Sequence, residues 1–551
     1  MFKGGTVERV EATTFREGLL QACRVLDVHK EEVNALNVFP VPDGDTGTNM
    51  SLTMQSAAEA VSKAPEDIEA MAKALGNGSL MGARGNSGVI LSQLCRGLAQ
   101  SLKGKEVILL SDIAEALESA RAKAYKAVMQ PTEGTILTIA RAMSEFAVQN
   151  QHEYHDIVAF LKDILCHANH VLQQTPDMLA ELKEAGVVDA GGQGLIYLLC
   201  GFVEHLSGED LHSLLEQSKT QSPQVETTSQ GRVQALKTEK AFFVSFQIEN
   251  IERDRMLRHL EHYGVLESIK ETQNGFFVEA YTDAPVKLIT SQDKRGDLKE
   301  IHVLSTREHT LRQSEQKDSP NKTPGPAHQG KALSRYGFVA VCMGEGFCSL
   351  FRDMMVNEIV SGGQTMNPST KDLLDAVERV PAETVFILPN NKNIILAAEQ
   401  VQELTEKNVV VIPTRSMPEG IMALFNFDDT ADAQRNEMRM TTSLEEILTG
   451  QVTYAVRDSE VNGVSVKAGD RIGLLNGEIV LTDAEDEALV ERLVEVYRKP
   501  EHTLITIYVG HDADADKAQK LSDKLALRWP DCEVECIHGG QPVYSYIFSM
   551  E

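Results

Sequence analysis

The pattern of apolar residues changes along the chain, and this change limits the possible folds more than any other feature. Between residues 12 and 217, apolar side chains recur close to the helical period in segments rich in Ala, Leu, Met and Glu. Beyond residue 240 they gather instead in short runs such as Ala241–Phe246 and Gly275–Thr282, which are typical of strands. The sequence therefore predicts a multidomain protein with an all-α N-terminal domain followed by α/β domains.

Two polar connectors set the expected domain boundaries. Residues 218–238 and 306–335 have no periodic apolar face, so we interpret both as linkers, the second one flexible. This division predicts a helical domain at 1–217, a small α/β middle domain at 239–305 and an α/β C-terminal domain at 336–551. Within the first domain, helices are expected at residues 12–36, 52–75, 86–102, 111–130, 136–150, 155–173 and 192–217.

The C-terminal domain alternates strand-like and helix-like segments. The strand-like runs are FVAVCM, TVFILP, VVVIPT and LITIYVG, and the helix-like segments lie around Met354, Ala398 and Leu424. This alternation predicts a largely parallel sheet covered by helices. Residues 451–482 are expected to form a β-rich insertion in this domain.

The overall composition excludes several classes of partner. The formal net charge of −28 disfavours a nucleic acid or an anionic lipid surface as a ligand. The eight cysteines include no Cys-x-x-Cys pair, which favours free, mostly buried thiols in a reducing compartment. There is no signal-peptide pattern and no apolar stretch of membrane-spanning length. We therefore expect a cytoplasmic protein that does not insert into a membrane.

The segment from Asn37 to Met50, NVFPVPDGDTGTNM, carries the strongest chemical signal. Asp43 and Asp45 alternate within a tight turn that has no Lys or Arg, so their carboxylates repel each other unless a cation lies between them. Mg²⁺ suits such a pair, because it combines one or two carboxylates with nucleotide phosphates. The phosphate donors nearby are Thr46, Thr48 and Asn49. By spacing alone, an ordinary solvated Asp-Gly turn is the favoured interpretation of the segment.

A second glycine-rich segment precedes the helix expected at 86–102. Its glycines alternate with polar residues and lead into the apolar run VILSQL, so several backbone N–H groups and a helix dipole point at one place, which suits a phosphate. An ordinary interhelical loop is the alternative. Arg84 is the cation placed to meet the charge of a transferring phosphoryl group, although an exposed Arg in a loop is usually only solvated. The candidate phosphate-binding residues are Gly82, Gly85, Asn86, Ser87 and Gly88.

These segments carry a family resemblance. Residues 43–50, DGDTGTNM, resemble the nucleotide-binding L subunit of dihydroxyacetone kinases, and the longer form from residue 36 to 50 resembles the catalytic subunit of bacterial fatty acid kinase. Further similar segments follow in the family's order at residues 80–93, 131–137, 184–195, 359–370, 388–396 and 539–544. The resemblance covers nearly the whole chain. It implies a helical-barrel N-terminal domain that binds ATP and Mg²⁺, and a DegV-like C-terminal half.

The resemblance also implies further site residues. Thr132 and Thr135 correspond to a second loop that faces the nucleotide, and Asp189, Gly191 and Gly192 to a last nucleotide-contacting turn, with a helix N-cap as the alternative role of Asp189. In the dihydroxyacetone kinases a third Asp precedes the Asp-x-Asp pair by five residues, a spacing that falls on Val38 here. The fatty acid kinase form has one extra residue and puts Asn in place of that Asp, so the resemblance implies Asn37 as a third Mg²⁺ ligand beside Asp43 and Asp45, with a capping or turn role as the alternative. Met50 is expected to pack on adenine, although Met at helical spacing is more often part of a core.

The expected reaction follows from the nucleophile. A fatty carboxylate is already ionised, so it needs no general base. It needs positioning and neutralisation of phosphoryl charge, which Arg84, loop N–H groups and Mg²⁺ held by Asp43 and Asp45 can supply. By resemblance, a DegV-family protein presents the fatty acid, the product is an acyl phosphate for phospholipid synthesis, and the kinase is a homodimer whose C-terminal domain docks the carrier. The alternatives are a dihydroxyacetone-type kinase, which acts on a small triose, and a non-catalytic nucleotide-binding scaffold.

The middle domain departs from the resemblance. Fatty acid kinases commonly carry there a Cys and two His that resemble a metal site, whereas this chain has Val244, Glu279 and Tyr281 at those positions. Because Zn²⁺ needs about four N, S or O ligands, we expect no zinc in this domain.

Overall fold

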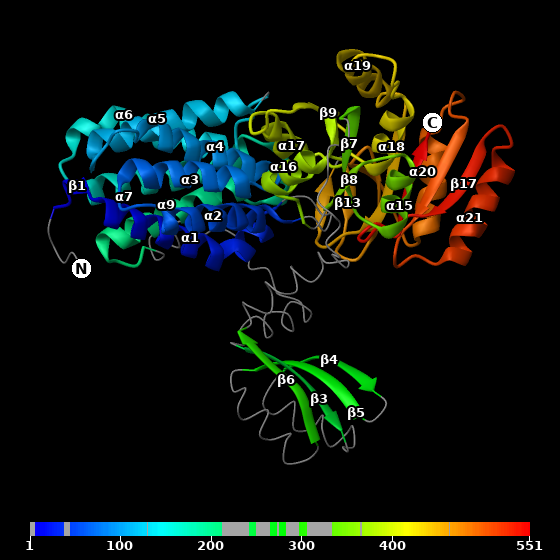
Figure 1. Cartoon of the computed structure of the whole chain (residues 1–551), viewed down its shortest axis with the longest axis horizontal. Coiled ribbons are helices and arrows are strands. Elements are labelled where there is room, and N and C mark those ends of the chain that lie inside the picture. Colours follow the sequence, from blue (N-terminus) through cyan, green and yellow to red (C-terminus); the bar gives the residue numbers. More distant parts are fainter. Residues whose placement is uncertain are drawn as a thin grey trace. The chain divides into compact units, whose positions relative to one another are not determined.

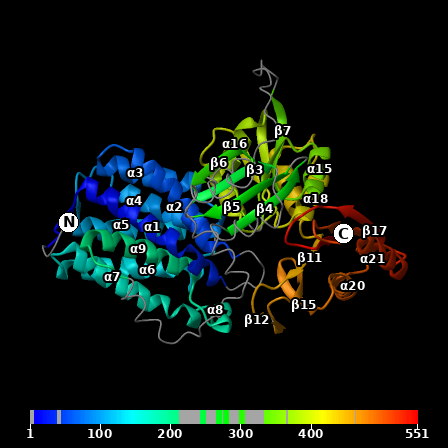
Figure 2. The ribbon, with the colours of Figure 1, turned by 90° about the horizontal axis from the view of Figure 1, so that it is seen from below.

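The computed structural model describes residues 6–37, 44–128, 130–211, 242–249, 265–272, 275–282, 297–305, 333–363, 366–461 and 463–551. The chain divides into two compact units, one formed by residues 1–222 with 331–551 and the other by residues 223–330. The larger unit contains both the helical domain and the C-terminal α/β domain, shown from two sides in Figures 1 and 2.

The N-terminal domain is a closed ring of eight of the described helices. Each helix from α1 to α7 packs beside the next, and α9 packs against both α7 and α1, so the expected helical barrel is confirmed. The helices are α1 (Ala12–Ala35), α2 (Thr46–Lys63), α3 (Ile68–Gly82), α4 (Gly85–Ser101), α5 (Leu110–Ala127), α6 (Ile136–Asn150), α7 (Ile157–Leu172), the short α8 (Ala180–Ala185) and α9 (Ala190–Ser207). A two-stranded pairing of β1 (Arg9–Val10) with β2 (Ile108–Leu109) completes the domain.

Small residues allow the ring to close. Gly201 of α9 lies so near α1 that a Cβ on it would be 2.8 Å from the Cα of Ala22. The interior is apolar, with side chains such as Leu26 and Phe160 fully buried. Burial of this continuous apolar stripe, rather than intrinsic helix propensity, accounts for most of the stability of such helices.

One expected helix is two helices. The apolar period predicts a single segment over residues 52–75, but α2 ends at Lys63 and α3 begins at Ile68. The break has a local cause, because Ala64 precedes Pro65 and takes the extended conformation that a residue before proline prefers. Asp67 then starts the next helix, since its side chain accepts a hydrogen bond from the backbone N–H of Ala70.

The C-terminal domain contains two main sheets rather than one. The first is fully parallel in the order β10-β9-β7-β8, and the second runs β15-β14-β11-β18-β16-β17 with only the β16–β17 pair parallel. The strands are β7 (Ser334–Cys342), β8 (Glu358–Ser361), β9 (Ala382–Leu388), β10 (Asn408–Val411), β11 (Leu448–Tyr454), β12 (Ser459–Val461), β13 (Val464–Val466), β14 (Arg471–Leu475), β15 (Glu478–Asp483), β16 (Leu504–Val509), β17 (Glu533–His538) and β18 (Tyr546–Met550). The expectation of a largely parallel sheet is therefore correct for the first sheet and wrong for the second.

The second sheet differs because its strands have short connections. The β-rich segment expected at 451–482 is confirmed as strands, but β11, β14 and β15 form part of this sheet instead of an insertion, and only β12 and β13 form a separate hairpin. A two-residue turn joins β14 to β15, and such a turn produces antiparallel neighbours. The helices of the domain are α15 (Glu345–Asp353), α16 (Thr370–Arg379), α17 (Ile395–Gln402), α18 (Met417–Phe425), α19 (Ala433–Ser443), α20 (Asp486–Tyr497) and α21 (Ala515–Arg528).

The smaller unit contains a four-stranded antiparallel sheet in its described residues. The order is β4-β5-β3-β6, formed by β3 (Phe242–Glu249), β4 (Val265–Thr272), β5 (Gly275–Thr282) and β6 (Asp297–Ser305). The strands expected at AFFVSF and GFFVEAYT are confirmed. The rest of the expected α/β arrangement, the first linker and most of the second lie outside the described residues.

Two expectations drawn from composition can be compared with the structure. Within the described part of the chain, no helix combines the length and apolarity needed to cross a membrane. All eight cysteines are free, and five of them are buried, which confirms the expectation of mostly buried thiols.

Candidate active site

Four helix starts gather at one end of the helical barrel. They are the N-termini of α2, α4, α6 and α9, and every candidate site residue that the structure describes, other than Asn37, Gly82 and Thr132, lies on or directly before one of them. Close backbone packing holds them together, with Gly85 against Asn49, Gly194 against Met50 and Gly191 against Ile136. Because each helix start exposes unpaired N–H groups and the positive end of a dipole, this end of the barrel suits an anionic ligand.

At the start of α2, the expected metal-binding turn is partly described. Asp45 is the N-cap residue of α2, and its carboxylate is half-buried. Asn37 follows the end of α1 and lies beside Gly44, on which a Cβ would be 3.8 Å from the Cβ of Asn37. Asp43 lies outside the described residues, so the structure brings together only two of the three expected ligands.

Asn34, which the sequence interpretation did not include, fixes the first turn of α2. Its Oδ1 accepts a hydrogen bond from the backbone N–H of Thr48 at 3.1 Å, and its Nδ2 donates to the Thr48 hydroxyl at 3.0 Å. Thr46 is the first residue of the helix and is half-buried. The turn is therefore held by α1 before any ligand arrives.

The start of α4 is tied to α2. The buried hydroxyl of Thr53 accepts a hydrogen bond from the Arg84 backbone N–H at 3.3 Å and donates to the carbonyl of Asn49 at 2.7 Å. Gly85 has a φ of +58°, and a Cβ there would be 2.6 Å from Asn49 Nδ2, so both conformation and space require glycine. Ser87 is half-buried in the first turn of α4.

Three of the candidate residues have packing roles that need no nucleotide. Met50 is completely buried, with its sulfur against Gly194 of α9. Gly82 packs against Ser56, and Gly88 lies against the Thr53 hydroxyl, where a Cβ would be 2.4 Å away. These positions bring the helix starts close together, and their contact with a nucleotide remains a prediction.

The loop before α6 is organised by Glu133. Thr135 caps α6, and its hydroxyl donates to the backbone carbonyl of Thr132 at 2.8 Å. The Glu133 carboxylate accepts hydrogen bonds from Thr138 and Arg141. Desolvation acts to raise the pKa of Glu133, but hydrogen bonds from Thr138, Arg141 and Tyr125 outweigh it and hold this pKa below its usual value. Glu133 is therefore an ionised anchor of the loop.

The start of α9 is capped by Asp189. Its Oδ2 accepts the backbone N–H of Gly192 at 2.6 Å, so the N-cap alternative for Asp189 is confirmed. Desolvation raises the pKa of Asp189 to about 6 against the lowering effect of backbone hydrogen bonds from Gly192 and Ile136. Gly191 packs on Ile136, where the starts of α6 and α9 meet.

The C-terminal domain covers the end of the barrel at which these helix starts gather. Asn367, in the loop between β8 and α16, donates from Nδ2 to Asp45 Oδ2 at 2.6 Å. The carbonyl oxygen of Asn367 accepts a hydrogen bond from Arg84 Nη1 at 2.7 Å. The backbone N–H of Thr370 donates to the Ala83 carbonyl at 3.0 Å, and Ala83 is fully buried in the apolar core around α16 and α17. Two residues expected to be catalytic thus contact the other half of the unit.

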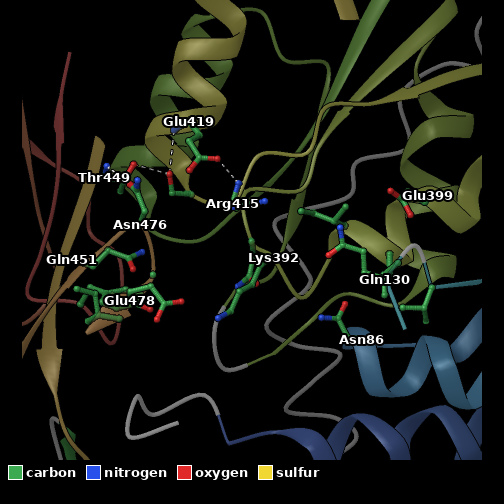
Figure 3. A pocket seen from close by; sticks show the side chains of 18 residues that line it. Asn86, Gln130, Lys392, Glu399, Arg415, Glu419, Thr449, Gln451, Asn476 and Glu478 are labelled. Carbon is green, nitrogen blue, oxygen red and sulfur yellow. Dashed lines mark hydrogen bonds between the residues drawn. The ribbon is translucent and has the colours of Figure 1, made fainter. Parts of the chain in front are cut away.

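A cleft opens beside these contacts. Its volume is about 580 Å³, and its wall includes Asn86 from α4 together with Lys392 and Arg415 from the C-terminal domain. In Figure 3, Asn86 and Gln130 lie toward the helical barrel, and Lys392 and Arg415 lie between them and the strands of the second sheet. The carboxylates on its wall include those of Glu399 and Glu419, whose pKa values are raised by desolvation.

The described donors fit a hard divalent cation. Asp45 and Asn37 supply carboxylate and amide oxygens, which Mg²⁺ prefers. The Oδ1 atom of Asn367 is buried and has no hydrogen-bond partner in the described part of the chain, although its own amide nitrogen contacts Asp45. An unsatisfied buried acceptor next to a carboxylate indicates a place for a further group.

The sequence interpretation missed Asn34, Thr53 and Asn367. Asn34 lies at helical spacing within α1, where an Asn has no distinctive pattern. Thr53 is one of several Thr and Ser residues in α2. Asn367 did carry a signal, because the segment 359–370 resembles the family, but the sequence alone does not indicate which distant residues it contacts.

Comparisons with known proteins first define a class. A family model described as the DAK2 domain matches residues 40–204, which contain all four helix starts. A second family model, which describes the C-terminal domain of FakA-like fatty acid kinase proteins, matches residues 337–551. The protein is thus a DAK2-domain protein with a fatty-acid-kinase-type C-terminal domain.

Full-length relatives then give the family. An uncharacterized protein of Staphylococcus saprophyticus is 37% identical over 560 residues, which cover 99% of this chain and 100% of the relative. Protein YloV of Bacillus subtilis is 37% identical over 558 residues, with coverage of 99% and 100%. The chain belongs to the FakA-like family of fatty acid kinase proteins.

Solved structures show a weaker likeness. The fatty acid binding protein DegV from Bacillus subtilis has 12% identity and a TM-score of 0.32, covering 39% of this chain and 99% of DegV. The Streptococcus pneumoniae fatty acid kinase B3 protein loaded with linoleic acid has 11% identity and a TM-score of 0.27, covering 39% and 99%. At these scores neither structure bears on the function of this chain.

Proposed function

We propose that this protein transfers the γ-phosphoryl group of ATP, with Mg²⁺, to the carboxylate of a fatty acid presented by a DegV-family fatty-acid-binding protein. The product is an acyl phosphate, which serves phospholipid synthesis. The family supports a kinase built from more than one kind of chain, since it is named for one component of a fatty acid kinase. The acceptor, the carrier and the role of each residue are our own inference.

One observation carries the proposal. Asp45 and Arg84 lie at two helix starts that meet at one end of the barrel, and a cleft lined by Asn86 leads from the same helix start toward Lys392 and Arg415. Phosphates bound at the helix starts would therefore adjoin a cavity large enough for an acceptor group. Such an arrangement supports transfer between two substrates rather than nucleotide binding alone.

Different residues of the chain would hold the cation and the phosphates. Asp45, Asn37 and Asp43 would hold Mg²⁺, which on binding neutralises phosphate charge. The first N–H groups of α2 and α4, which include those of Thr46, Gly85, Asn86 and Ser87, would bind phosphate oxygens. Arg84 would add a fixed positive charge beside them, because its guanidinium is already oriented by Asn367 and by Asp372, 3.5 Å away.

The chemistry requires no general base. An oxygen of the ionised carboxylate forms a bond to the γ-phosphorus while the bond from that phosphorus to the β–γ bridging oxygen breaks, and ADP leaves with that electron pair. No proton is gained or lost in this step. Lys392 and Arg415 would attract the carboxylate into the cleft, and exclusion of water would protect the acyl phosphate from hydrolysis.

The test is a phosphoryl-transfer assay with the whole chain. Purified protein is incubated with ATP, Mg²⁺ and an acyl-loaded DegV-family carrier, and acyl phosphate is trapped with hydroxylamine and measured. We expect acyl phosphate and ADP in equal amounts, and little turnover with free fatty acid. Turnover with dihydroxyacetone would favour the triose kinase, and ATP binding without any transfer would favour the scaffold.

We also propose that the protein acts as a homodimer in the cytoplasm. Light scattering after size exclusion measures the mass directly. A mass near twice 60.6 kDa is the expected result, and a mass near 60.6 kDa would contradict it.

A further inference from the structure

We propose that Asn367 is a positioning residue of the phosphoryl-transfer site, contributed by the C-terminal domain to a metal–phosphate site that the helical domain leaves incomplete. The inference rests on the proposed function for the identity of the ligand. It goes beyond that function, because it assigns a part of the nucleotide site to the half of the protein that lacks a nucleotide motif.

Asn367 joins the two charged groups of the site. Its side chain donates to Asp45 at 2.6 Å, and its backbone carbonyl accepts from Arg84 at 2.7 Å. A single residue thus bridges the start of α2 and the start of α4. Gly85 leaves room for it, since a Cβ at that position would be 3.3 Å from Asn367 Nδ2. This one residue therefore contacts both charged side chains of the site.

The orientation of the carboxamide follows from its neighbour. An ionised carboxylate accepts hydrogen bonds only, so the nitrogen of Asn367 must face Asp45 and the oxygen must point elsewhere. Asn367 is only 1% exposed, and its Oδ1 has no partner among the described residues. Leaving a buried acceptor unpaired is energetically costly, so a donor is expected there in the working state.

A hydrated cation at Asp45 would supply the hydrogen-bond donor for Asn367 Oδ1. Because Oδ1 and Nδ2 belong to the same carboxamide, a group that meets Oδ1 lies beside the Asp45 carboxylate. A cation held by Asp45 brings water in its hydration shell, and Mg²⁺ usually keeps several such waters. Asn367 would therefore orient Asp45 through its nitrogen and the hydrated cation through its oxygen, as outer-shell partners of metal ligands commonly do.

The segment that follows Asn367 is held by hydrogen bonds. Ser369 caps α16, with Asp372 closing a capping box. The backbone N–H of Thr370 is bonded to the carbonyl of Ala83, the residue directly before Arg84. The backbone that follows Asn367 is thus anchored to the helical domain, which supports a positioning role.

A purely structural role predicts something different, and the same interface supplies the control. Gln93 Nε2 of α4 donates to Gln400 Oε1 of α17 at 2.6 Å, away from Asp45 and Arg84. If Asn367 only held the two halves together, Asn367→Ala and Gln400→Ala would have similar effects. If it positions the metal ligand, only Asn367→Ala weakens cation binding.

The experiment measures Mn²⁺ binding to the whole chain by electron paramagnetic resonance, together with ATP affinity in Mg²⁺ and in EDTA. For Asn367→Ala we expect a loss of about 10-fold in Mn²⁺ affinity and in ATP affinity with Mg²⁺, but no change in EDTA. Gln400→Ala should stay within about 2-fold of the wild type, because it removes one neutral hydrogen bond far from the cation.

Two outcomes overturn the inference: Mn²⁺ affinity unchanged in Asn367→Ala, or lowered equally in Gln400→Ala. Should Asn367→Ala not fold, Asn367→Leu, which keeps the volume and removes both polar atoms, is judged by the same criterion. Acyl phosphate formation by the wild type is measured in parallel. If Asn367→Ala loses Mn²⁺ affinity and the wild type forms no acyl phosphate, the proposed function is rejected and this inference stands. If Asn367→Ala keeps its Mn²⁺ affinity and the wild type forms acyl phosphate, this inference is rejected and the proposed function stands.

Discussion

The helical domain and the C-terminal domain contribute different kinds of group to the same site. The helical domain supplies four helix starts and the charged side chains of Asp45 and Arg84. The C-terminal domain meets them with carboxamides: Asn367 donates to Asp45, and Asn393 accepts from Asn86. Asp45 and Arg84 thus come from the helical half, and the C-terminal half adds neutral carboxamides together with the carboxylate of Asp372 beside Arg84. The difference teaches that the half with the recognisable motif holds the chemistry, while the other half sets its geometry.

The largest effect should come from removing a charge on the helical side. Asp45→Ala is expected to lower Mg²⁺-dependent ATP binding and turnover at least about 100-fold, because it removes a metal ligand that the other half can orient but not replace. Calorimetric titration with Mg–ATP measures the loss. Glu59→Ala is the matched control, since it removes an exposed carboxylate from the other end of α2. Near-normal turnover of the Asp45 variant would reject the metal site.

A smaller loss is expected at Gly85, which lies beside Asn367 of the C-terminal half. Gly85→Ala forces a residue with a φ of +58° to carry a Cβ 2.6 Å from Asn49, so we expect about 2–4 kcal/mol of lost stability and weaker nucleotide binding. Gly104→Ala is the control, because its φ is +75° but nothing lies within 4 Å. Thermal unfolding of both variants separates backbone strain from crowding, and equal losses would show that Gly85 is not crowded.

A pH-dependent change in stability is expected from the start of α9. None of the contacts described above joins this helix start to the C-terminal half. The pKa of Asp189 is raised to about 6 in the folded protein. Between pH 4 and 6 the Asp189 carboxyl is therefore ionised in the unfolded chain but protonated in the folded protein. This group should therefore lower stability as the pH rises through that window, by about 1–3 kcal/mol, and add no change above it. The difference in melting temperature between the wild type and Asp189→Asn, followed from pH 4 to 7, measures this contribution. A pH-independent difference would contradict the raised pKa.

The smallest effect is expected from a charged contact between the halves. Arg96 of α4 lies 3.3 Å from Glu403, whose side chain is 61% exposed. Water and salt screen such a pair, so Glu403→Gln should change the melting temperature by the equivalent of less than about 1 kcal/mol and leave ATP affinity unchanged. A larger loss would mean that charges, rather than carboxamides and apolar packing, hold the halves together.

The two halves also differ in how far their sequences predict them. Most helices of the first domain follow from apolar period and caps. The break at Pro65 escapes that pattern because alanine-rich flanks hide a short interruption. The short α8 is not among the expected helices, and α9 ends at Ser207, before a left-handed Gly208, rather than at the expected residue 217. In the C-terminal domain, apolar runs predict the strands but not their direction. The antiparallel second sheet depends on which strands pair, for example β11 with β18, nearly 100 residues apart in the chain, and no local pattern carries that information.

The same limit applies to the site. The motif around Asp45 predicts a phosphate and metal site because its carboxylates, glycines and hydroxyls are adjacent in sequence. The bond between Asp45 and Asn367 joins residues 322 positions apart, and an Asn in a loop has many alternative roles. Long-range contacts of this kind become visible only when the fold is known.

The most direct test of the account is a crystal structure of the whole protein with Mg²⁺ and a non-hydrolysable ATP analogue. We predict that the phosphates lie at the starts of α2 and α4, that the cation contacts Asp45, and that Asn367 Oδ1 accepts a hydrogen bond from the cation's hydration shell. A nucleotide bound elsewhere, such as at the carboxyl ends of the parallel strands β7 and β9, would contradict the account.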